Sequence, residues 1–114
     1  MGRRAVGPPS VLRGEIWLAD VGLAEAKRFV IVSNNERNRS LRDVLGVRMT
    51  TAPKPSLPSI VEFRSGQVSA ERSFAVADDI VPLRKTDLIE RVGGLTLGQM
   101  HRLEAAIRAA LALD

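Results

Sequence analysis

The chain has 114 residues, of which 45% are apolar, and its formal net charge is +4. This length suits one domain with a modest hydrophobic core. The absence of cysteine excludes disulfides, cysteine nucleophiles and Cys-based zinc sites, and the single histidine, His101, excludes a paired-histidine catalyst within one chain. No apolar run approaches the roughly 20 residues of a membrane span, and no signal peptide is recognisable. We therefore expect a cytoplasmic protein without membrane contact.

The N-terminal half predicts an arm followed by two strands. Residues 1–12 are rich in glycine and proline, so we expect a flexible arm before a domain at 13–114. The alternating pattern of residues 14–20, GEIWLAD, predicts a strand. Residues 28–33, RFVIVS, are apolar on both faces and predict a central strand. Residues 34–43 are polar and predict a loop with about one helical turn.

A third strand is predicted at residues 44–51, VLGVRMTT, where side chains alternate between two faces. The core face is expected to carry Leu45, Val47 and Met49. The opposite face, away from the core, is expected to carry Val44, Gly46, Arg48 and Thr50.

The remaining chain predicts a stiff proline-rich loop at 52–58 and four short strands, at residues 59–63, 73–78, 79–83 and 88–94. Pro82 marks the third of these as peripheral. A C-terminal helix is predicted after the N-cap candidate Thr96, with an apolar stripe of Leu97, Met100, Leu103, Ile107 and Leu111. The pattern predicts a mainly β fold with α, a small barrel or curled sheet of about six to seven strands with the helix packed on it.

Positive charge is concentrated between residues 27 and 54, where seven cations less two acids give +5, whereas the rest of the chain carries −1. Such a segment indicates a polyanionic partner. A solvated cationic face without a partner is the alternative. The four aromatic residues are few, and three of them lie in apolar strand contexts. Contacts from Arg, Lys, Asn, Ser and Thr are therefore favoured over base stacking.

RNA cleavage is compatible with these restrictions, because the 2′-hydroxyl of RNA is an internal nucleophile that needs no metal. The protein must then position the reacting groups and stabilise the negative charge that develops on phosphorus. Arginine offers a fork of donors for phosphate oxygens, and threonine offers one hydroxyl donor. Asp78 and Asp79 are adjacent carboxylates of the kind that bind magnesium, but the pair is a weak signal and no metal or other cofactor is expected.

Five segments resemble, in order, motifs of the MazF/PemK family of toxin endoribonucleases from bacterial toxin–antitoxin systems. They are RGEIWLADVG, RFVIVSNNERN, VRMTT, SFAVADDI and RVGGLTLGQMHRLEAAIRAALAL. The resemblance implies an SH3-like barrel with a C-terminal helix, which forms a homodimer. It also implies metal-independent, sequence-specific cleavage of single-stranded RNA to 2′,3′-cyclic phosphate and 5′-hydroxyl ends, which inhibits translation and growth. A cognate antitoxin with an acidic tail is the implied protein partner.

The resemblance further implies the functional residues. Arg28 and Thr50 match the family's catalytic arginine and threonine. The residues expected to contact RNA are Ser33, Asn34, Asn35, Arg37, Arg48, Thr51, Lys54 and Asp78. For Asp78, a structural hydrogen-bonding role is an equal alternative.

The chain also departs from the family pattern. The loop at residues 23–27 is shorter than usual, and this loop commonly shapes access of RNA. Arg48 stands where the family has proline, and Asp79 stands where it has glutamine. Two other functions remain open: a CcdB-like toxin that binds DNA gyrase and cleaves nothing, and a nuclease-dead barrel that binds nucleic acid or a partner helix.

Overall fold

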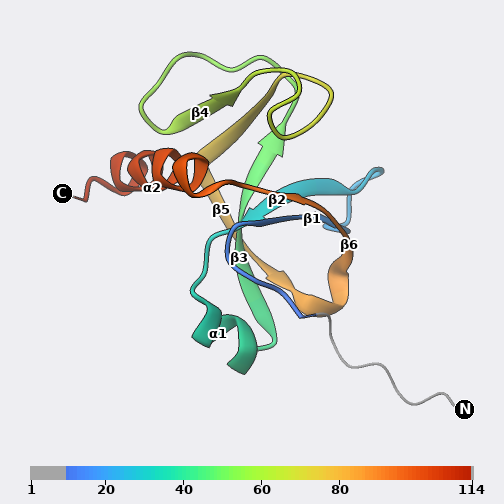
Figure 1. The fold of residues 1–114 in the computed structure, drawn as a ribbon. Coiled ribbons are helices and arrows are strands. Elements are labelled where there is room, and N and C mark those ends of the chain that lie inside the picture. The colour runs from blue at the N-terminus through green and yellow to red at the C-terminus, as the bar shows by residue number, and fades with distance from the viewer. Residues whose placement is uncertain (1–9, 114) are drawn as a thin grey trace, which may run out of the picture.

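The computed structural model describes residues 10–113, which form one six-stranded antiparallel sheet and two α-helices (Figure 1). The strands are β1 (Glu15–Ala19), β2 (Lys27–Ile31), β3 (Asp43–Thr50), β4 (Ile60–Phe63), β5 (Ser73–Arg84) and β6 (Leu88–Gly94). The helices are α1 (Asn35–Ser40) and α2 (Leu97–Leu111), and a short 3₁₀ turn, η1, spans Lys85–Asp87. The predicted mainly β fold with a terminal helix is confirmed.

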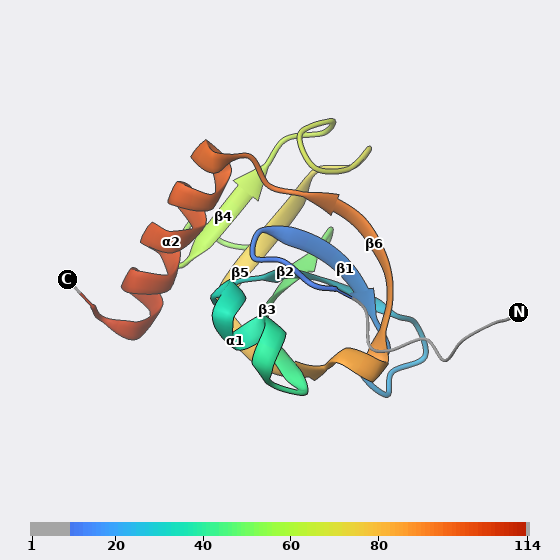
Figure 2. The ribbon, with the colours of Figure 1, turned by 60° about the horizontal axis from the view of Figure 1, so that its bottom comes forward.

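The strands lie in the order β4-β5-β3-β2-β1-β6, and every neighbouring pair is antiparallel. This order places β2 inside the sheet, as its apolar run predicts. The sheet is strongly curled, and α2 packs against β4 and β5 (Figure 2). Neither helix in the described part of the chain is long and apolar enough to cross a membrane.

The hydrophobic core lies on both faces of β3. Val47 and Met49 belong to one buried cluster, which Leu103 of α2 covers. Val44 belongs to a second cluster, together with Trp17 of β1. The prediction that Val44 faces away from the core was wrong, because the curled sheet encloses a second apolar cluster on that side.

Residues predicted as two strands, 73–78 and 79–83, form the single strand β5. Its first part lies between β4 and β3, whereas residues 80–84 pair with β3 alone among the described strands. This free edge accommodates Pro82, which has no N–H to donate to a second neighbour. The peripheral position of Pro82 is therefore confirmed, but the separate strand is wrong.

A bulge interrupts β5 where it passes Arg48. Between Val47 and Arg48 the register of β3 against β5 shifts, which leaves residues 77–79 without a partner in β3. A bulge bends its strand and redirects the side chains it carries. In this bulge the carboxylate of Asp79 lies 3.7 Å from the guanidinium of Arg48.

Helix α2 begins with a complete capping box. The Thr96 hydroxyl accepts a hydrogen bond from the Gln99 N–H, and the Gln99 side chain accepts one from the Thr96 N–H. The predicted N-cap is confirmed. Leu103 is fully buried, but Leu97 and Leu111 are 75% and 55% exposed. The predicted apolar stripe therefore packs on the sheet only along its middle.

The N-terminal end of the described chain is already packed against the sheet. Val11 is buried in the second cluster with Trp17, and the Gly14 N–H donates to the carbonyl of Ile31. Residues 11 and 12 of the predicted arm thus belong to the folded domain. The arm's residues 1–9 lie outside the described residues.

Glu15 ties this entry segment to the edge of the sheet. Its carboxylate accepts hydrogen bonds from the Leu12 N–H at 2.8 Å and from Trp17 Nε1 at 3.0 Å, and pairs with Arg91 at 3.0 Å. Burial raises the pKa of this carboxyl, but these hydrogen bonds and the charge of Arg91 outweigh it. The pKa of Glu15 therefore lies below its ordinary value.

Candidate nucleic-acid interface

A pocket of about 480 Å³ opens where β2 starts and β3 ends. Its cationic lining residues are Lys27, Arg28 and Arg48, and its hydroxyl-bearing lining residues are Thr50, Thr51, Ser69 and Ser73. Two carboxylates, those of Glu25 and Glu71, complete the polar part of its wall. The pocket thus combines donors for an anion with groups that can accept a proton.

The pairing of β2 with β3 brings the two predicted catalytic residues to this pocket. Arg28 lies opposite Met49, the residue before Thr50. Arg28 is exposed, and no ion pair within residues 10–113 engages its guanidinium. The Thr50 hydroxyl oxygen accepts a hydrogen bond from the Ala52 N–H at 3.1 Å. That bond uses a lone pair of the Thr50 oxygen and leaves its hydrogen able to donate to a ligand.

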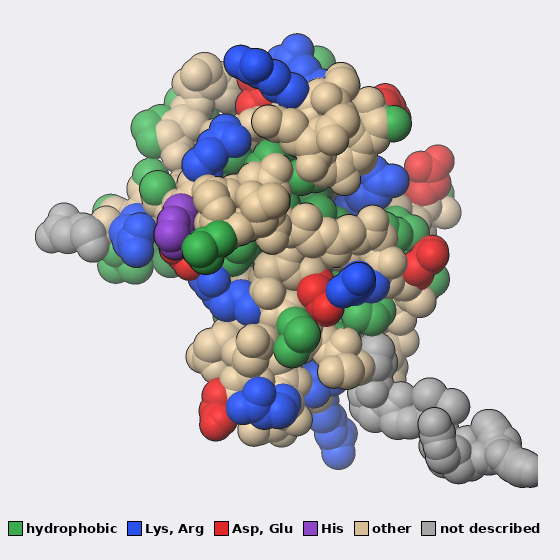
Figure 3. Space-filling model, in the orientation of Figure 1, with side chains coloured by type: hydrophobic (Ala, Val, Ile, Leu, Met, Phe, Trp, Pro, Cys, Tyr) green, Lys and Arg blue, Asp and Glu red, His purple; other side chains and the backbone are tan. Residues whose placement is uncertain are grey.

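Part of the positive charge between residues 27 and 54 is neutralised by ion pairs. The three pairs are Arg37 with Asp43 at 3.1 Å, Arg39 with Glu36 at 3.0 Å, and Arg48 with Asp79 at 3.7 Å. On the face shown in Figure 3, the Lys and Arg side chains lie at several separate places rather than in one patch. This face therefore carries no continuous basic patch among the described residues.

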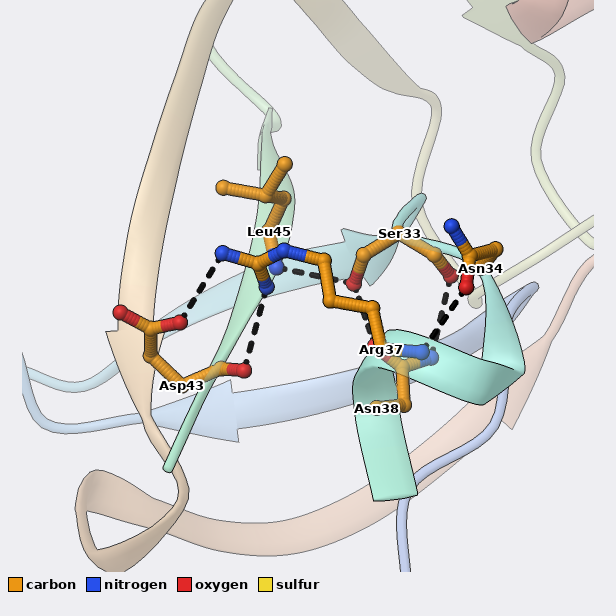
Figure 4. Close-up of polar contacts among 6 residues, drawn as sticks. All are labelled: Ser33, Asn34, Arg37, Asn38, Asp43 and Leu45. Carbon is orange, nitrogen blue, oxygen red and sulfur yellow. Dashed lines mark hydrogen bonds and ion pairs between the residues drawn. The ribbon is translucent and has the colours of Figure 1, made fainter. Parts of the chain in front are cut away.

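Ser33 belongs to a buried polar network at the other end of β2 (Figure 4). Its hydroxyl donates to the side-chain oxygen of Asn38 and accepts from the Leu45 N–H at 3.0 Å. The Asn38 amide donates back to the Ser33 carbonyl at 3.0 Å. Ser33 is only 5% exposed, so its hydroxyl links β2, α1 and β3. Ser33 thus has a structural role in the fold. Its contact with RNA stays a prediction.

Asn34, Asn35 and Arg37 also have internal partners around α1. The Asn34 side chain caps α1 by accepting from the Arg37 N–H at 2.8 Å. The Asn35 side chain accepts from the Arg13 N–H at 2.7 Å, and Arg37 pairs with Asp43. All three residues remain at least partly exposed. Their contact with RNA stays a prediction.

The predicted site therefore separates into two groups. Arg28, Thr50, Arg48 and Thr51 line the pocket, whereas the group from Ser33 to Arg37 follows the far end of β2. Figure 1 shows α1 beside the N-terminal end of β3, with the arrowhead of β3 pointing away from it. At about 3.3 Å per residue, β2 alone separates the two groups by roughly 15 Å. A ligand that contacts both groups must therefore be extended.

Lys54 and Asp78 lie outside the pocket lining. Lys54 is exposed in the loop after β3. The Asp78 carboxylate accepts a hydrogen bond from the Ser59 hydroxyl at 2.7 Å, which joins the end of that loop to β5. This contact is the structural role weighed for Asp78, and it leaves the carboxylate exposed.

Sequence reasoning missed Glu25, Glu71, Ser69 and Ser73, all of which line the pocket. The first three lie in loops whose course no local pattern specifies. Ser73 reads as an ordinary first residue of a strand. Glu25 precedes Arg28 by only three residues, whereas the other three reach the pocket through the position of β5 and the loop before it.

A small curled antiparallel sheet with a cationic, hydroxyl-lined pocket defines a protein suited to bind an anionic chain. Comparison with known proteins gives the family. The model of the PemK-like, MazF-like toxins of type II toxin–antitoxin systems matches residues 12–111. The chain therefore belongs to this toxin family, and the resemblance seen in its motifs is confirmed.

Individual relatives agree with this assignment. The chain is 36% identical over 102 residues to Endoribonuclease MazF4 of Mycobacterium tuberculosis and to Endoribonuclease MazF1 of Mycobacterium bovis, which covers 90% of this chain and 93% of each relative. A solved endoribonuclease from a mycobacterial species superimposes with a TM-score of 0.80 at 34% identity, covering 93% of this chain and 95% of that one. A mycobacterial endoribonuclease solved with its cognate antitoxin gives 0.81 at 35% identity, covering 91% and 97%.

Proposed function

We propose that the protein is the toxin of a toxin–antitoxin pair and a sequence-specific endoribonuclease acting on single-stranded RNA. The proposal rests on one observation above others: antiparallel pairing of β2 and β3 brings Arg28 and Thr50 to the same pocket. The names of the mycobacterial relatives, which are endoribonucleases, support the same activity.

The proposed chemistry uses the substrate's own nucleophile. The 2′-oxygen attacks the adjacent phosphorus, so the O2′–P bond forms and the P–O5′ bond breaks. The 2′-hydroxyl loses its proton and the leaving O5′ gains one. The products are a 2′,3′-cyclic phosphate and a 5′-hydroxyl, and no step requires a metal ion.

Arg28 and Thr50 would stabilise the charge that develops on the non-bridging oxygens. The guanidinium of Arg28 offers a pair of parallel donors, and the Thr50 hydroxyl offers one more. A guanidinium offers donors and no acceptor, so Arg28 is assigned to charge stabilisation and not to proton uptake. Preorganised donors of this kind each change a rate by roughly 10²–10³.

The proton of the 2′-hydroxyl needs an acceptor in the pocket. Glu25 and Glu71 are the two carboxylates in its lining. His101 is exposed on α2 and does not line the pocket. We assign proton uptake to this pair of glutamates, and a comparison of Glu25→Gln with Glu71→Gln identifies the one that acts.

We further propose a homodimer and a cognate antitoxin whose acidic tail covers the cations of the pocket. An acidic tail and RNA would then compete for Lys27, Arg28 and Arg48. Attraction between exposed charges is screened by salt, so the affinity of the complex should fall as ionic strength rises. An affinity unchanged between low and high salt would contradict this partner chemistry.

The activity is tested by incubating the purified protein with a long single-stranded RNA in EDTA, beside Arg28→Ala and Thr50→Ala. Arg108→Ala is the matched control, because Arg108 is exposed on α2 away from the pocket lining. Discrete fragments with 5′-hydroxyl ends from the parent and the control, lost in both pocket variants, are expected.

Two other outcomes have distinct meanings. Cleavage that survives both pocket substitutions would keep the activity and reject the site. Intact RNA with a folded, antitoxin-free parent would reject the nuclease and favour a gyrase-binding or nuclease-dead protein. If the protein binds gyrase, its expression in cells would stop DNA replication rather than deplete RNA.

A further inference from the structure

Ser73, the first residue of β5, has a buried hydroxyl without a hydrogen-bond partner in the described chain. The residue is 3% exposed, it pairs with Phe63 of β4, and it lines the pocket beside Arg28 and Thr50. A buried polar group normally has a partner, because losing water without replacement is unfavourable. Ser73 therefore contributes no side-chain hydrogen bond to the described fold, although the residue belongs to the pocket lining.

A second buried polar atom lies in the same wall. The Nε of Arg48 is buried and has no hydrogen-bond partner within residues 10–113. Ser73 Oγ and Arg48 Nε are the two buried side-chain atoms of the described residues in this condition, and both residues line the one pocket. Arg48 can only donate, whereas a serine hydroxyl can donate or accept. Together they suit the edge of a ligand that carries acceptor atoms.

The rest of the pocket lining indicates which part of RNA enters. Beside its charged and hydroxyl-bearing residues, the lining has apolar members, which are Ile16, Leu18, Ala26, Met49, Val68, Ala70 and Val92. A volume of roughly 300–1,000 Å³ in which apolar side chains stand beside polar groups is typical of sites for small organic groups. A nucleobase has this character, with apolar faces and a polar edge. A phosphate would lose its hydration against these side chains, and it has the exposed Arg28 available at the pocket wall.

We propose that the pocket takes one nucleobase adjacent to the cleaved phosphate, and that Ser73 Oγ hydrogen-bonds the edge of this base and so sets part of the cleavage sequence. Arg48 Nε donates a second hydrogen bond to an acceptor of the same nucleotide. This inference rests on the proposed ribonuclease function and adds the residue that selects the base.

The test compares cleavage sequences of the parent and Ser73→Ala on a pool of RNAs randomised around the cleaved bond. Loss of one hydrogen bond is expected to lower kcat/KM on the preferred sequence on the order of ten-fold. For substrates with another base at the position bound in the pocket, kcat/KM should fall far less. The sequence preference should therefore be lost at that one position only. Ser56→Ala is the matched control, because Ser56 is exposed and lies outside the pocket lining. Its cleavage sequence should equal that of the parent.

A thermal unfolding measurement accompanies the cleavage assay. Because the Ser73 hydroxyl has no partner in the fold, Ser73→Ala should unfold at a temperature no lower than the parent. A variant that fails to fold would overturn the inference, since it would mean that the hydroxyl stabilises the fold. Active parent and active Ser73→Ala with the same preference at every position would overturn it while leaving the nuclease intact. A parent that cleaves nothing would overturn the proposed function and this inference together.

Discussion

Replacing Arg48 by alanine should change how RNA binding depends on salt. Three cations line the pocket, Lys27, Arg28 and Arg48. Each phosphate neutralised on a single strand contributes about −0.7 to the slope of log K against log salt concentration, so three contacts give about −2.1. Raising salt from about 50 to about 200 mM should then weaken parent binding roughly 20-fold, and binding of Arg48→Ala, with a slope of about −1.4, roughly 7-fold.

Asp79 does not prevent Arg48 from meeting a phosphate. The two side chains are each about two-fifths exposed, at 41% and 40%, and 3.7 Å apart. An exposed pair of this kind contributes about 0–1 kcal/mol, so a phosphate can displace the carboxylate. The terminal nitrogens of Arg48 would then face the backbone while its buried Nε faces the base.

The assay is fluorescence anisotropy with a labelled RNA whose cleaved residue lacks the 2′-hydroxyl, so that binding is measured without reaction. Arg108→Ala serves again as control and should keep the parent slope. A slope for Arg48→Ala equal to that of the parent would refute the assignment of a phosphate to Arg48. A parent slope near zero would refute the electrostatic account of the pocket altogether.

Three further changes have defined outcomes. Asp79→Asn should tighten binding of the same RNA by a few-fold at low salt; unchanged affinity would show that the carboxylate does not compete with RNA. Gly46→Ala should lower the stability of the fold by roughly 1–3 kcal/mol, because an added Cβ would lie 2.7 Å from the Leu83 side chain. The control is Gly98→Ala on α2, where an added Cβ has no neighbour within 4 Å. This control should not destabilise the protein in the same urea titration. Glu15→Gln should be less stable than the parent at neutral pH, because the lowered pKa of Glu15 stabilises the fold only while the carboxyl is ionised. The difference in stability should shrink as the pH falls below the ordinary carboxyl pKa of about 4.3. A difference independent of pH in urea unfolding would contradict this.

The elements that the sequence predicted well are those with local physical signals. The apolar run of β2 required a place inside the sheet, and Thr96 with Gln99 specified the start of α2. Arg28 and Thr50 were paired through the family resemblance, and the structure brings them together because the start of β2 lies beside the end of β3. The inferences on β2 and α2 need only nearest neighbours in the chain or in the sheet.

The features that sequence reasoning missed depend on distant parts of the chain. Val44 looked solvent-facing because alternation alone cannot show that a curled sheet encloses a second cluster. Ser33 was grouped with Arg28 because the family resemblance implies that both contact RNA, although the length of β2 separates them. The buried hydroxyl of Ser73 became visible only when β5 was placed between β4 and β3.

The network around Asn38 has a consequence for producing the protein. Residues 38–40 read Asn-Arg-Ser, which is an acceptor sequence for N-linked glycans. Asn38 is 2% exposed, and its amide bonds the Ser33 carbonyl. A sugar attached to the Asn38 amide during secretion would prevent this side chain from packing between α1, β2 and β3. The modified chain could then not form this part of the fold. Expression through a eukaryotic secretory route would therefore yield misfolded protein, whereas bacterial or cell-free synthesis leaves the amide unmodified.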